Sequence, residues 1–153
     1  GSQGIRRNPK IIRQRMRPLT ILEIEHIAHT LAKKIMSWDR PIPDFGTRYP
    51  SVLEGCLITP FQTFTKKHLY KGLVGKAAIL FYLMIKNHPF QNGNKRIAAT
   101  TLLYFFYRSK KWLRLDNKEF YNFAVWVAAS NSRVKDATVQ AIQKLFKTYL
   151  IDL

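Results

Sequence analysis

The sequence predicts an all-α bundle with a small β excursion, and three observations lead to this fold class. Five segments carry apolar residues in helical patterns, and two of these are apolar around most of their circumference, as in helices at the centre of a bundle. One short stretch, 60–65, is instead rich in aromatic and β-branched residues, which predicts an extended strand or flap. The length of 153 residues fits one domain.

The first predicted helix covers about 20–37. It opens on a capping box, in which the Thr20 side chain accepts from the backbone and the Glu23 side chain reaches back. Apolar residues then recur at three- and four-residue steps, at Ile24, Ile27, Leu31 and Ile35. His26 and His29 have no ligand-type partner at helical spacing, so we expect structural or surface roles for both.

A loop follows at 39–46, where two prolines and a glycine interrupt any period. Ser51 is in a position to cap a short second helix. The first strongly apolar helix is predicted over about 69–87 and stops before Pro89, because proline disfavours helix in the residue that precedes it. The second apolar helix is predicted over about 94–109. Beyond it we expect an extended segment at 112–115 and helices over about 116–129 and 134–150.

The charge balance favours anionic partners. The chain has 26 Lys and Arg residues against 9 Asp and Glu, a net charge of +17, and such a field attracts nucleic acid, nucleotide phosphates, acidic proteins or an anionic membrane without selecting one. Residues 5–17 hold six basic groups and no acid, so residues 1–18 form either a solvated basic segment or an electrostatic arm, ahead of a helical domain at 19–153.

Composition also bears on location. The longest apolar run, 77–85, has nine residues, whereas a membrane-spanning helix needs roughly 20, so we expect no membrane partner. No signal peptide is visible. The single cysteine, Cys56, has apolar neighbours and is expected to be buried and inert, and a cytoplasmic location follows weakly from this cysteine usage.

The segment between the two apolar helices is the candidate functional site. Its sequence is His88-Pro89-Phe90-Gln91-Asn92-Gly93-Asn94-Lys95-Arg96. The start of the second helix has unpaired N–H groups and a positive dipole end, which bind anions such as phosphate. Gly93 lets a ligand approach the backbone, Lys95 and Arg96 add positive charge, and His88 can accept a proton. A phosphate site beside a base points to phosphate-transfer chemistry. Taken singly, each of these residues is also typical of a helix end, a turn or a solvated face.

These nine residues resemble the signature loop of the Fic/Doc family, the pattern H-x-F-x-(D/E/N)-(G/A)-N-(G/K)-R. The resemblance covers roughly residues 19–130. It includes the Leu19-Thr20 helix start, the Arg48…Leu53-Glu54 segment, the run Pro60, Phe64, Leu69 and Tyr70, and the residues Lys76-Ala77-Ala78 and Lys86-Asn87 that fit the Doc (death-on-curing toxin) branch.

The resemblance implies a Fic/Doc-like helical bundle with a small β flap that transfers part of ATP, with Mg²⁺, to a protein hydroxyl. By position, His88 resembles the catalytic base and Phe90 the apolar anchor of the loop. Asn92 resembles the metal-binding position. The nucleotide- and phosphate-binding positions are Gly93, Asn94, Lys95 and Arg96. The flap that positions the target peptide would contain Phe61, Gln62, Thr63 and Phe64.

Two departures from the pattern shape the functional hypotheses. Asn92 replaces an acidic residue and offers Mg²⁺ an oxygen without a carboxylate charge. Lys95 replaces the glycine of adenylylating members, as in Doc-like kinases. The inhibitory Ser/Thr-x-x-x-Glu-Gly helix of many Fic proteins is not matched, because Pro50 stands at its first position, so a separate antitoxin is expected.

Three functions remain open at this point. The first is a Doc-like toxin that moves the γ-phosphate of ATP to Ser or Thr of a translation elongation factor. The second is a Fic-type adenylyltransferase. The third is a weakly active or inactive basic module that binds nucleic acid or an acidic partner, which the net charge of +17 and Asn92 favour and which the intact His88, Asn94 and Arg96 disfavour.

Overall fold

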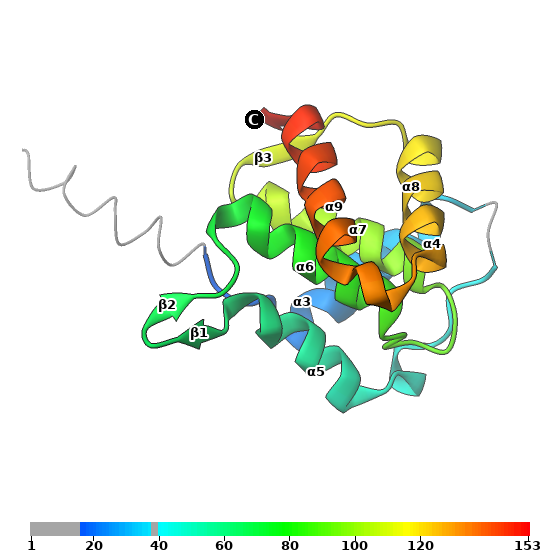
Figure 1. Ribbon diagram of the computed structural model, residues 1–153. Coiled ribbons are helices and arrows are strands. Elements are labelled where there is room, and N and C mark those ends of the chain that lie inside the picture. The colour runs from blue at the N-terminus through cyan, green and yellow to red at the C-terminus, as the bar shows by residue number, and fades with distance from the viewer. Residues whose placement is uncertain (1–15, 38–39) are drawn as a thin grey trace, which may run out of the picture.

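The structure is a computed structural model that describes residues 16–37 and 40–153, and it confirms the predicted fold class. The described chain is mostly helical, with two small antiparallel two-stranded sheets. Figure 1 shows the helices gathered in one body from which a β-hairpin projects. Residues 1–15 lie outside the described residues, and so does the greater part of the predicted basic arm. No helix of the described chain is long and apolar enough to cross a membrane.

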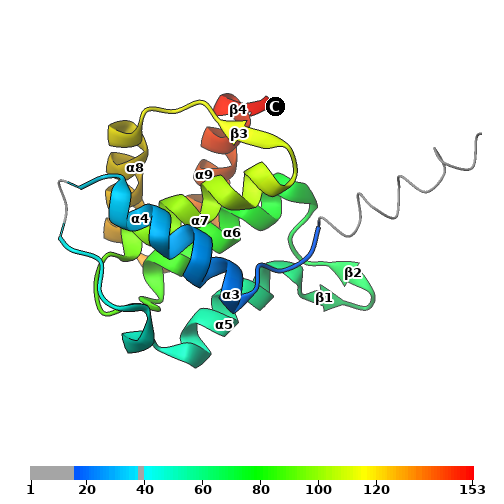
Figure 2. The same ribbon diagram turned by 180° about the vertical axis from the view of Figure 1, so that it is seen from behind.

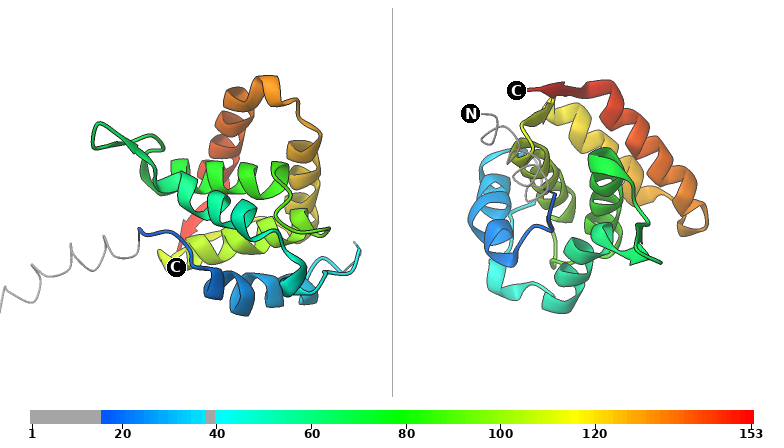
Figure 3. Two further views of the ribbon diagram at one scale, coloured as in Figure 1. Left: turned by 90° about the horizontal axis from the view of Figure 1, so that it is seen from below. Right: turned by 90° about the vertical axis from the view of Figure 1, so that its left-hand side faces the viewer.

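Two apolar helices form the centre of the bundle, as predicted. Helix α6 (Gly72–Lys86) buries every residue from 75 to 85, and helix α7 (Asn94–Arg108) is buried along most of its length. Helix α9 (Lys135–Tyr149) packs on α6, α8 (Asn117–Ala129) contacts both central helices, and the first helix packs on α7. The right panel of Figure 3 shows α6 and α7 between the first helix and α9. Helix α6 begins at Gly72 rather than near 69, because the preceding residues complete the hairpin.

The first helix is continuous but not uniform. It consists of α3 (Ile21–Glu23), a π-helical stretch (Ile24–His29) and α4 (Thr30–Lys34), so it ends three residues before the predicted boundary. The wider π turn rotates the buried face. Ile24 is fully buried as predicted, but Ala28 and Ala32 share that face, whereas Ile27, Leu31 and Ile35 are only half-buried.

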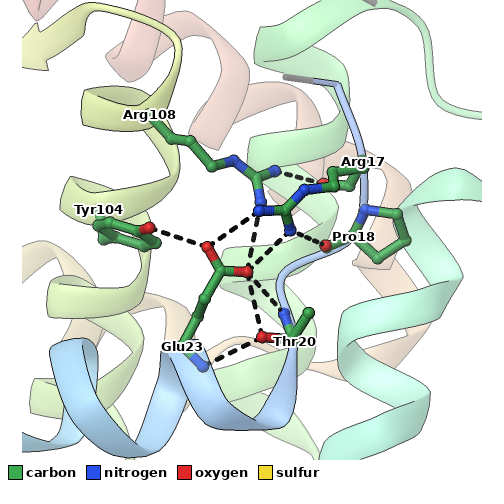
Figure 4. A network of polar contacts seen from close by, with 6 residues as sticks. All are labelled: Arg17, Pro18, Thr20, Glu23, Tyr104 and Arg108. Carbon is green, nitrogen blue, oxygen red and sulfur yellow. Dashed lines mark hydrogen bonds and ion pairs between the residues drawn. The ribbon is translucent and has the colours of Figure 1, made fainter. Parts of the chain in front are cut away.

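The predicted capping box is present, and its glutamate also joins the first helix to α7 (Figure 4). The carboxylate of Glu23 accepts hydrogen bonds from Arg17 Nη1 at 2.8 Å and from the Tyr104 hydroxyl at 2.8 Å, and Arg108 Nη1 lies 3.6 Å away. Burial alone raises the pKa of Glu23, but the bonds from Arg17, the Thr20 backbone and Tyr104 outweigh it and bring the pKa to about 2. The carboxylate is therefore charged at neutral pH.

Helix α5 (Pro50–Ile58) lies beneath the central pair and begins differently from the prediction. Proline occupies its first turn and Tyr49 is the residue before it, so Ser51 is not the cap. The Tyr49 backbone N–H donates to the carbonyl of Pro89 at 2.9 Å, which ties the start of α5 to the candidate loop. Cys56 is buried as predicted, and burial raises the pKa of its thiol to about 11, which keeps it inert.

A short 3-10 turn (Thr59–Phe61) leads from α5 into the hairpin, which confirms the predicted β excursion. Strand β1 (Thr63–Phe64) pairs with β2 (Lys67–His68), and all residues from 62 to 69 are exposed. Phe61 belongs to the 3-10 turn rather than to the strand. Its half-buried ring lies 6.4 Å from that of Phe105, so it anchors the base of the hairpin to the core.

The second sheet joins the C-terminal part of the chain to the end of α7. Strand β3 (Lys111–Leu113) overlaps the extended segment predicted at 112–115. Its partner β4 (Leu150–Asp152) was not predicted, and it begins at the residue where the last helix was expected to end. A 3-10 turn (Ser132–Val134) precedes α9. Asp116 caps α8 by accepting from the Lys118 backbone at 3.1 Å, close to the predicted start.

Candidate active site

The candidate loop connects the C-terminus of α6 to the N-terminus of α7 and is fixed at both ends. At the α6 end, Lys86 Nζ donates to the carbonyl of Ala128 at 3.2 Å and to that of Ser130 at 2.5 Å. These bonds cap the end of α8 and hold it beside the loop. At the α7 end, the chain turns into the helix through Gly93, which has φ +73°.

Gly93 meets two requirements at once. Its backbone lies in the left-handed region that glycine adopts without penalty. In addition, a Cβ atom at this position would lie 2.7 Å from Ile42 Cδ1, closer than real Cβ contacts allow. The loop at 40–43 is therefore packed directly over the start of α7.

The apolar anchor and its neighbouring amide organise the interior of the loop. Phe90 is 1% exposed, and its ring lies 6.0 Å from that of His29 and 5.9 Å from that of Phe45. Asn94 is also buried. Its Oδ1 accepts from the Phe90 N–H at 3.0 Å and its Nδ2 donates to the Phe90 carbonyl at 2.9 Å. The Asn94 side chain thus supports the loop, and its contact with phosphate stays a prediction.

His88 stands at the mouth of the loop, exposed and with φ +50°, an uncommon conformation for a residue other than glycine. Its Nδ1 lies 3.4 Å from Asn94 Nδ2. The two Phe90 bonds fix which end of the Asn94 amide carries hydrogens, so Nδ1 of His88 faces a donor. Of the two tautomers of a neutral ring, this contact favours the one with its proton on Nε2. Its length makes it weak, as catalytic hydrogen bonds often are before substrate binds.

A pocket of about 350 Å³ opens beside the loop. Five of the predicted site residues line it together, namely His88, Asn92, Gly93, Asn94 and Lys95. Arg40, Ile85, Gln91 and Ala128 complete the lining. The residues that line the pocket therefore include the basic residues Arg40 and Lys95 and no acidic residue. The whole stretch between Glu54 and Asp116, which includes the hairpin, both central helices and this loop, contains no acidic residue. Such a pocket suits an anion such as a nucleotide's phosphates.

Asn92 is the candidate metal ligand, and the structure tests how well the site fits a cation. Its Oδ1 is shielded from solvent and accepts no hydrogen bond from the described residues. A buried acceptor that has no hydrogen-bond donor suits a cation, or a donor group, that enters the pocket. Residues 16–37 and 40–153 hold no group of three or more His, Cys, Asp or Glu side chains that could bind a metal by themselves. The protein thus offers Mg²⁺ one amide oxygen, to be combined with phosphate oxygens of a ligand.

Arg96 does not occupy the place predicted for it. It is 3% exposed and is not among the residues that line the pocket. Its guanidinium donates to the carbonyls of Ala32, of Ile35 at 3.0 Å and of Arg40 at 2.6 Å. Ala32 lies in the last turn of α4 and Ile35 directly follows this helix, and the negative dipole end there favours a cation. Releasing a buried hydrogen bond costs about 1–3 kcal/mol for each group left unpaired, so this arrangement opposes direct phosphate binding by Arg96.

The predicted target flap lies far from His88. The hairpin precedes α6 and His88 follows it, and Figures 1 and 2 both show hairpin and loop at opposite ends of that helix. The 15 residues of α6 span about 21 Å at 1.5 Å per residue. A peptide held by Gln62, Thr63 and Phe64 would have to extend that far to reach His88, so this arrangement does not support direct positioning of a hydroxyl by the hairpin.

Sequence reasoning missed Arg40 and Ala128, which reach the pocket from segments about 50 residues before and about 35 residues after the loop. The sequence around Arg40 gives no direct sign that this residue reaches the pocket. It lies beside Pro41 and Pro43 in a segment interpreted as a connecting loop, and nothing in its local pattern indicates which pocket it reaches.

Comparison with known proteins identifies the family of this chain. No curated protein and no solved structure matches the chain. The model of the Fic/DOC family matches residues 18–106, which is more than half of the chain and spans the first helix, the hairpin, the candidate loop and nearly all of α7. The chain belongs to the Fic/DOC family.

Proposed function

We propose that this protein is a Doc-like transferase that moves the γ-phosphate of ATP to a Ser or Thr hydroxyl of another protein. Proteins of the Fic/DOC family are in general transferases and typically use ATP. The observation that carries the finer proposal is the pocket itself, in which His88 shares an acid-free, basic cavity with Lys95 at the start of α7. A translation elongation factor is the proposed target, and a separate antitoxin the proposed regulator.

The proposed reaction needs three things from the chain. The N–H groups at the start of α7 and the Lys95 ammonium hold phosphate oxygens and stabilise the charge that develops on them. His88 accepts the proton of the attacking hydroxyl at Nδ1, and the long contact of this atom with Asn94 Nδ2 is released when the hydroxyl binds. The hydroxyl oxygen then bonds to the γ-phosphorus, the bond from that phosphorus to the bridging oxygen breaks, and ADP leaves with the electron pair. Phe90 and Asn94 hold the geometry.

Asn92 is the residue that would contact Mg²⁺ bound with the nucleotide, and the ion would neutralise part of the phosphate charge. Because Asn92 brings no negative charge, Lys95 and the α7 N-terminus carry a larger share of that neutralisation here than in a site with a carboxylate. The protein is therefore expected to retain measurable ATP binding when Mg²⁺ is chelated.

The position of Lys95 favours phosphoryl over adenylyl transfer. It is half-buried and lines the pocket immediately after the N-terminus of α7. A lysine there occupies and recharges the space that a glycine leaves open, which changes the phosphate group that can settle at the helix start. With the γ-phosphorus facing His88, transfer produces a phosphoprotein. With the α-phosphorus facing His88, transfer produces an adenylylated protein and releases pyrophosphate.

Incubation of the protein with ATP labelled separately at the α- and γ-phosphorus, together with a cell extract, tests the proposal. We expect γ-label on a protein and no α-label, and loss of labelling by about 10²–10⁴-fold in His88→Ala. His26→Ala, which removes an exposed histidine of the first helix, is the matched control and should label normally. Lys95→Gly should lower γ-transfer and admit α-transfer.

Three other results of this labelling experiment would change the proposal. Transfer of α-label by the wild-type protein would replace the proposal with adenylyl transfer. Binding of nucleic acid or an acidic partner with no transfer of either label would favour the basic binding module. Normal labelling by His88→Ala would remove His88 from the role of base.

A further inference from the structure

Three helix ends meet at the pocket beside the candidate loop. The start of α7 contributes Gly93, Asn94 and Lys95 to its lining, the end of α6 contributes Ile85, and the end of α8 contributes Ala128. The N-terminus of a helix carries roughly half a positive charge, and its C-terminus carries roughly half a negative charge. The two C-termini therefore bring about one negative charge to a site where an anion should bind, and the single N-terminus offsets only about half of it.

Lys86 lies where the two C-termini meet. It is the last residue of α6 and provides the basic group in the last turn of that helix. Its Nζ donates to the carbonyl of Ala128 at 3.2 Å and to that of Ser130 at 2.5 Å, at the end of α8. Helix α8, which the structure describes in full, has no basic residue in its own last turn. The ammonium of Lys86 therefore bonds to carbonyls that α8 leaves unpaired and supplies the cation that this helix end otherwise lacks.

We propose that Lys86 is a positioning residue that makes this pocket accept a polyphosphate, because it neutralises the C-termini of α6 and α8 and holds Ala128 at the pocket wall. The inference rests on the proposed function for the identity of the ligand, a nucleoside triphosphate. Lys86 acts through the charge that it places beside two lining residues, Ile85, which precedes it in the chain, and Ala128, whose carbonyl its Nζ contacts. The effect of Lys86 on binding should therefore grow with the charge of the ligand.

A role in stability alone predicts a different result. Loss of the two bonds from Lys86 would loosen the end of α8 and lower the affinity for every ligand by a similar factor. The Ser130 hydroxyl donates to the Val127 carbonyl at 2.6 Å, so it stabilises the same helix end without adding charge and without joining α8 to α6. Ser130→Ala is therefore the matched control for the structural contribution.

The experiment measures the affinity of the purified protein for AMP, ADP and ATP by calorimetry at a fixed Mg²⁺ concentration, and the melting temperature without ligand. Lys86→Met should weaken ATP binding by about 3- to 30-fold, ADP binding by less, and AMP binding by less than about threefold. Lys86→Arg retains the charge and the donors and should restore most of the ATP affinity.

The controls should leave the dependence on ligand charge unchanged. Ser130→Ala should lower the melting temperature and keep all three affinities close to those of the wild type. Lys144→Met removes an exposed lysine of α9 and should bind as the wild type. Lys86→Gln keeps the inference testable if Lys86→Met does not fold, because glutamine retains an N–H donor for the end of α8 but carries no charge. It should weaken binding in the same order as Lys86→Met.

The outcomes separate this inference from the proposed function. If the wild type binds ATP but Lys86→Met loses affinity for AMP, ADP and ATP by one common factor, or loses none, the inference fails, whatever the protein transfers. If the loss grows from AMP to ATP but the wild type transfers no phosphate to protein, the inference holds and the proposed function fails. If the wild type binds none of the three nucleotides, both fail.

Discussion

Gly93 is the residue on which the shape of the pocket depends most directly. The left-handed backbone disfavours a side chain here, and the flexible end of the Ile42 side chain, 2.7 Å from an added Cβ atom, would have to move. We expect Gly93→Ala to lower the free energy of unfolding by about 1–3 kcal/mol, from backbone strain and displacement of Ile42. Chemical denaturation measures this change, and ATP affinity should fall with it.

Gly55→Ala is the control for that substitution. Gly55 lies in α5, and nothing is within 4 Å of a Cβ added there. Alanine should stabilise this helix by about 0.5–1 kcal/mol, because it has the better helix propensity. Equal effects of the two substitutions would show that the conformation of Gly93 is not required.

His29 links the first helix to the loop at 40–43. Its Nε2 is 2.7 Å from the Pro43 carbonyl, so it donates there and its ring is held in one tautomer. Burial has the largest effect and lowers the pKa of His29 below its usual 6.5. The bond to Pro43 opposes this lowering, Lys33 lowers the pKa further, and Glu25 and Asp44 raise it by smaller amounts. A histidine whose pKa is lowered by folding stabilises the fold above the unfolded pKa, and this stability is lost as pH falls below about 6.5.

We therefore expect the free energy of unfolding to fall between pH 7.5 and pH 5.5, and this fall to be smaller in His29→Gln, which keeps an N–H donor but does not titrate. Glu23, with a pKa of about 2, stays charged in the folded state throughout this window and does not interfere. The same slope in wild type and variant would assign the pH dependence to another group.

At the residue scale, sequence identified which residues gather at one pocket better than it identified the contacts that each side chain makes. His88, Asn92, Gly93 and Lys95 converge on one pocket, because all four belong to a short loop whose pattern is local. The structural bonds of Asn94 and Arg96 could not be predicted in the same way. Arg96 is bonded to residues more than 50 positions earlier, and no spacing in the sequence indicates which carbonyls a folded helix will present to it.

At the scale of elements, the hairpin is the best candidate for contact with a partner. Phe64 pairs with Lys67, and the Leu69 N–H donates to the Gln62 carbonyl, so alternation places Phe64, Lys67 and Leu69 on one face. Phe64 is 70% and Leu69 54% exposed. Lys66 and Lys71 add further charge. An extended acidic segment with apolar side chains is the partner that this face complements.

Replacement of Lys66, Lys67 and Lys71 by Glu should therefore raise the KM for the protein substrate by on the order of tenfold or more, through slower association. ATP affinity should be unchanged, because α6 separates the hairpin from the pocket. The matched control replaces three exposed basic residues elsewhere, Arg114, Lys144 and Lys147, by Glu. If this control raises the KM as much, only overall charge matters.

Elements with long periodic patterns were predicted within a few residues, and the shortest ones were not. Helices α6 and α7 have many apolar positions that agree with one another. Strand β4 has three residues, and its strand character depends on pairing with β3 from almost 40 residues earlier. The π turn in the first helix is likewise invisible to a 3.6-residue pattern, because it inserts a wider turn into the same periodic segment.

At the scale of the whole molecule, the net charge of +17 predicts salt-sensitive association with nucleic acid. We expect mixed-sequence RNA to bind weakly, with no sequence preference, and log K to fall linearly with log salt concentration as counterions are released. Fluorescence anisotropy at 50–300 mM salt measures the slope. Affinity that depends on sequence, or that is insensitive to salt, would indicate a built recognition surface instead.

The acid-free stretch from 55 to 115 also affects the thermal stability of the protein when no partner is bound. Like charges confined to one compact body repel one another, and dissolved ions or a bound polyanion relieve that repulsion. Whatever binds the folded form alone also stabilises it by mass action. An acidic partner would thus act as a counter-ion as well as a ligand. The protein should melt at a lower temperature when it is stripped of partners in dilute buffer than when it is held in a complex.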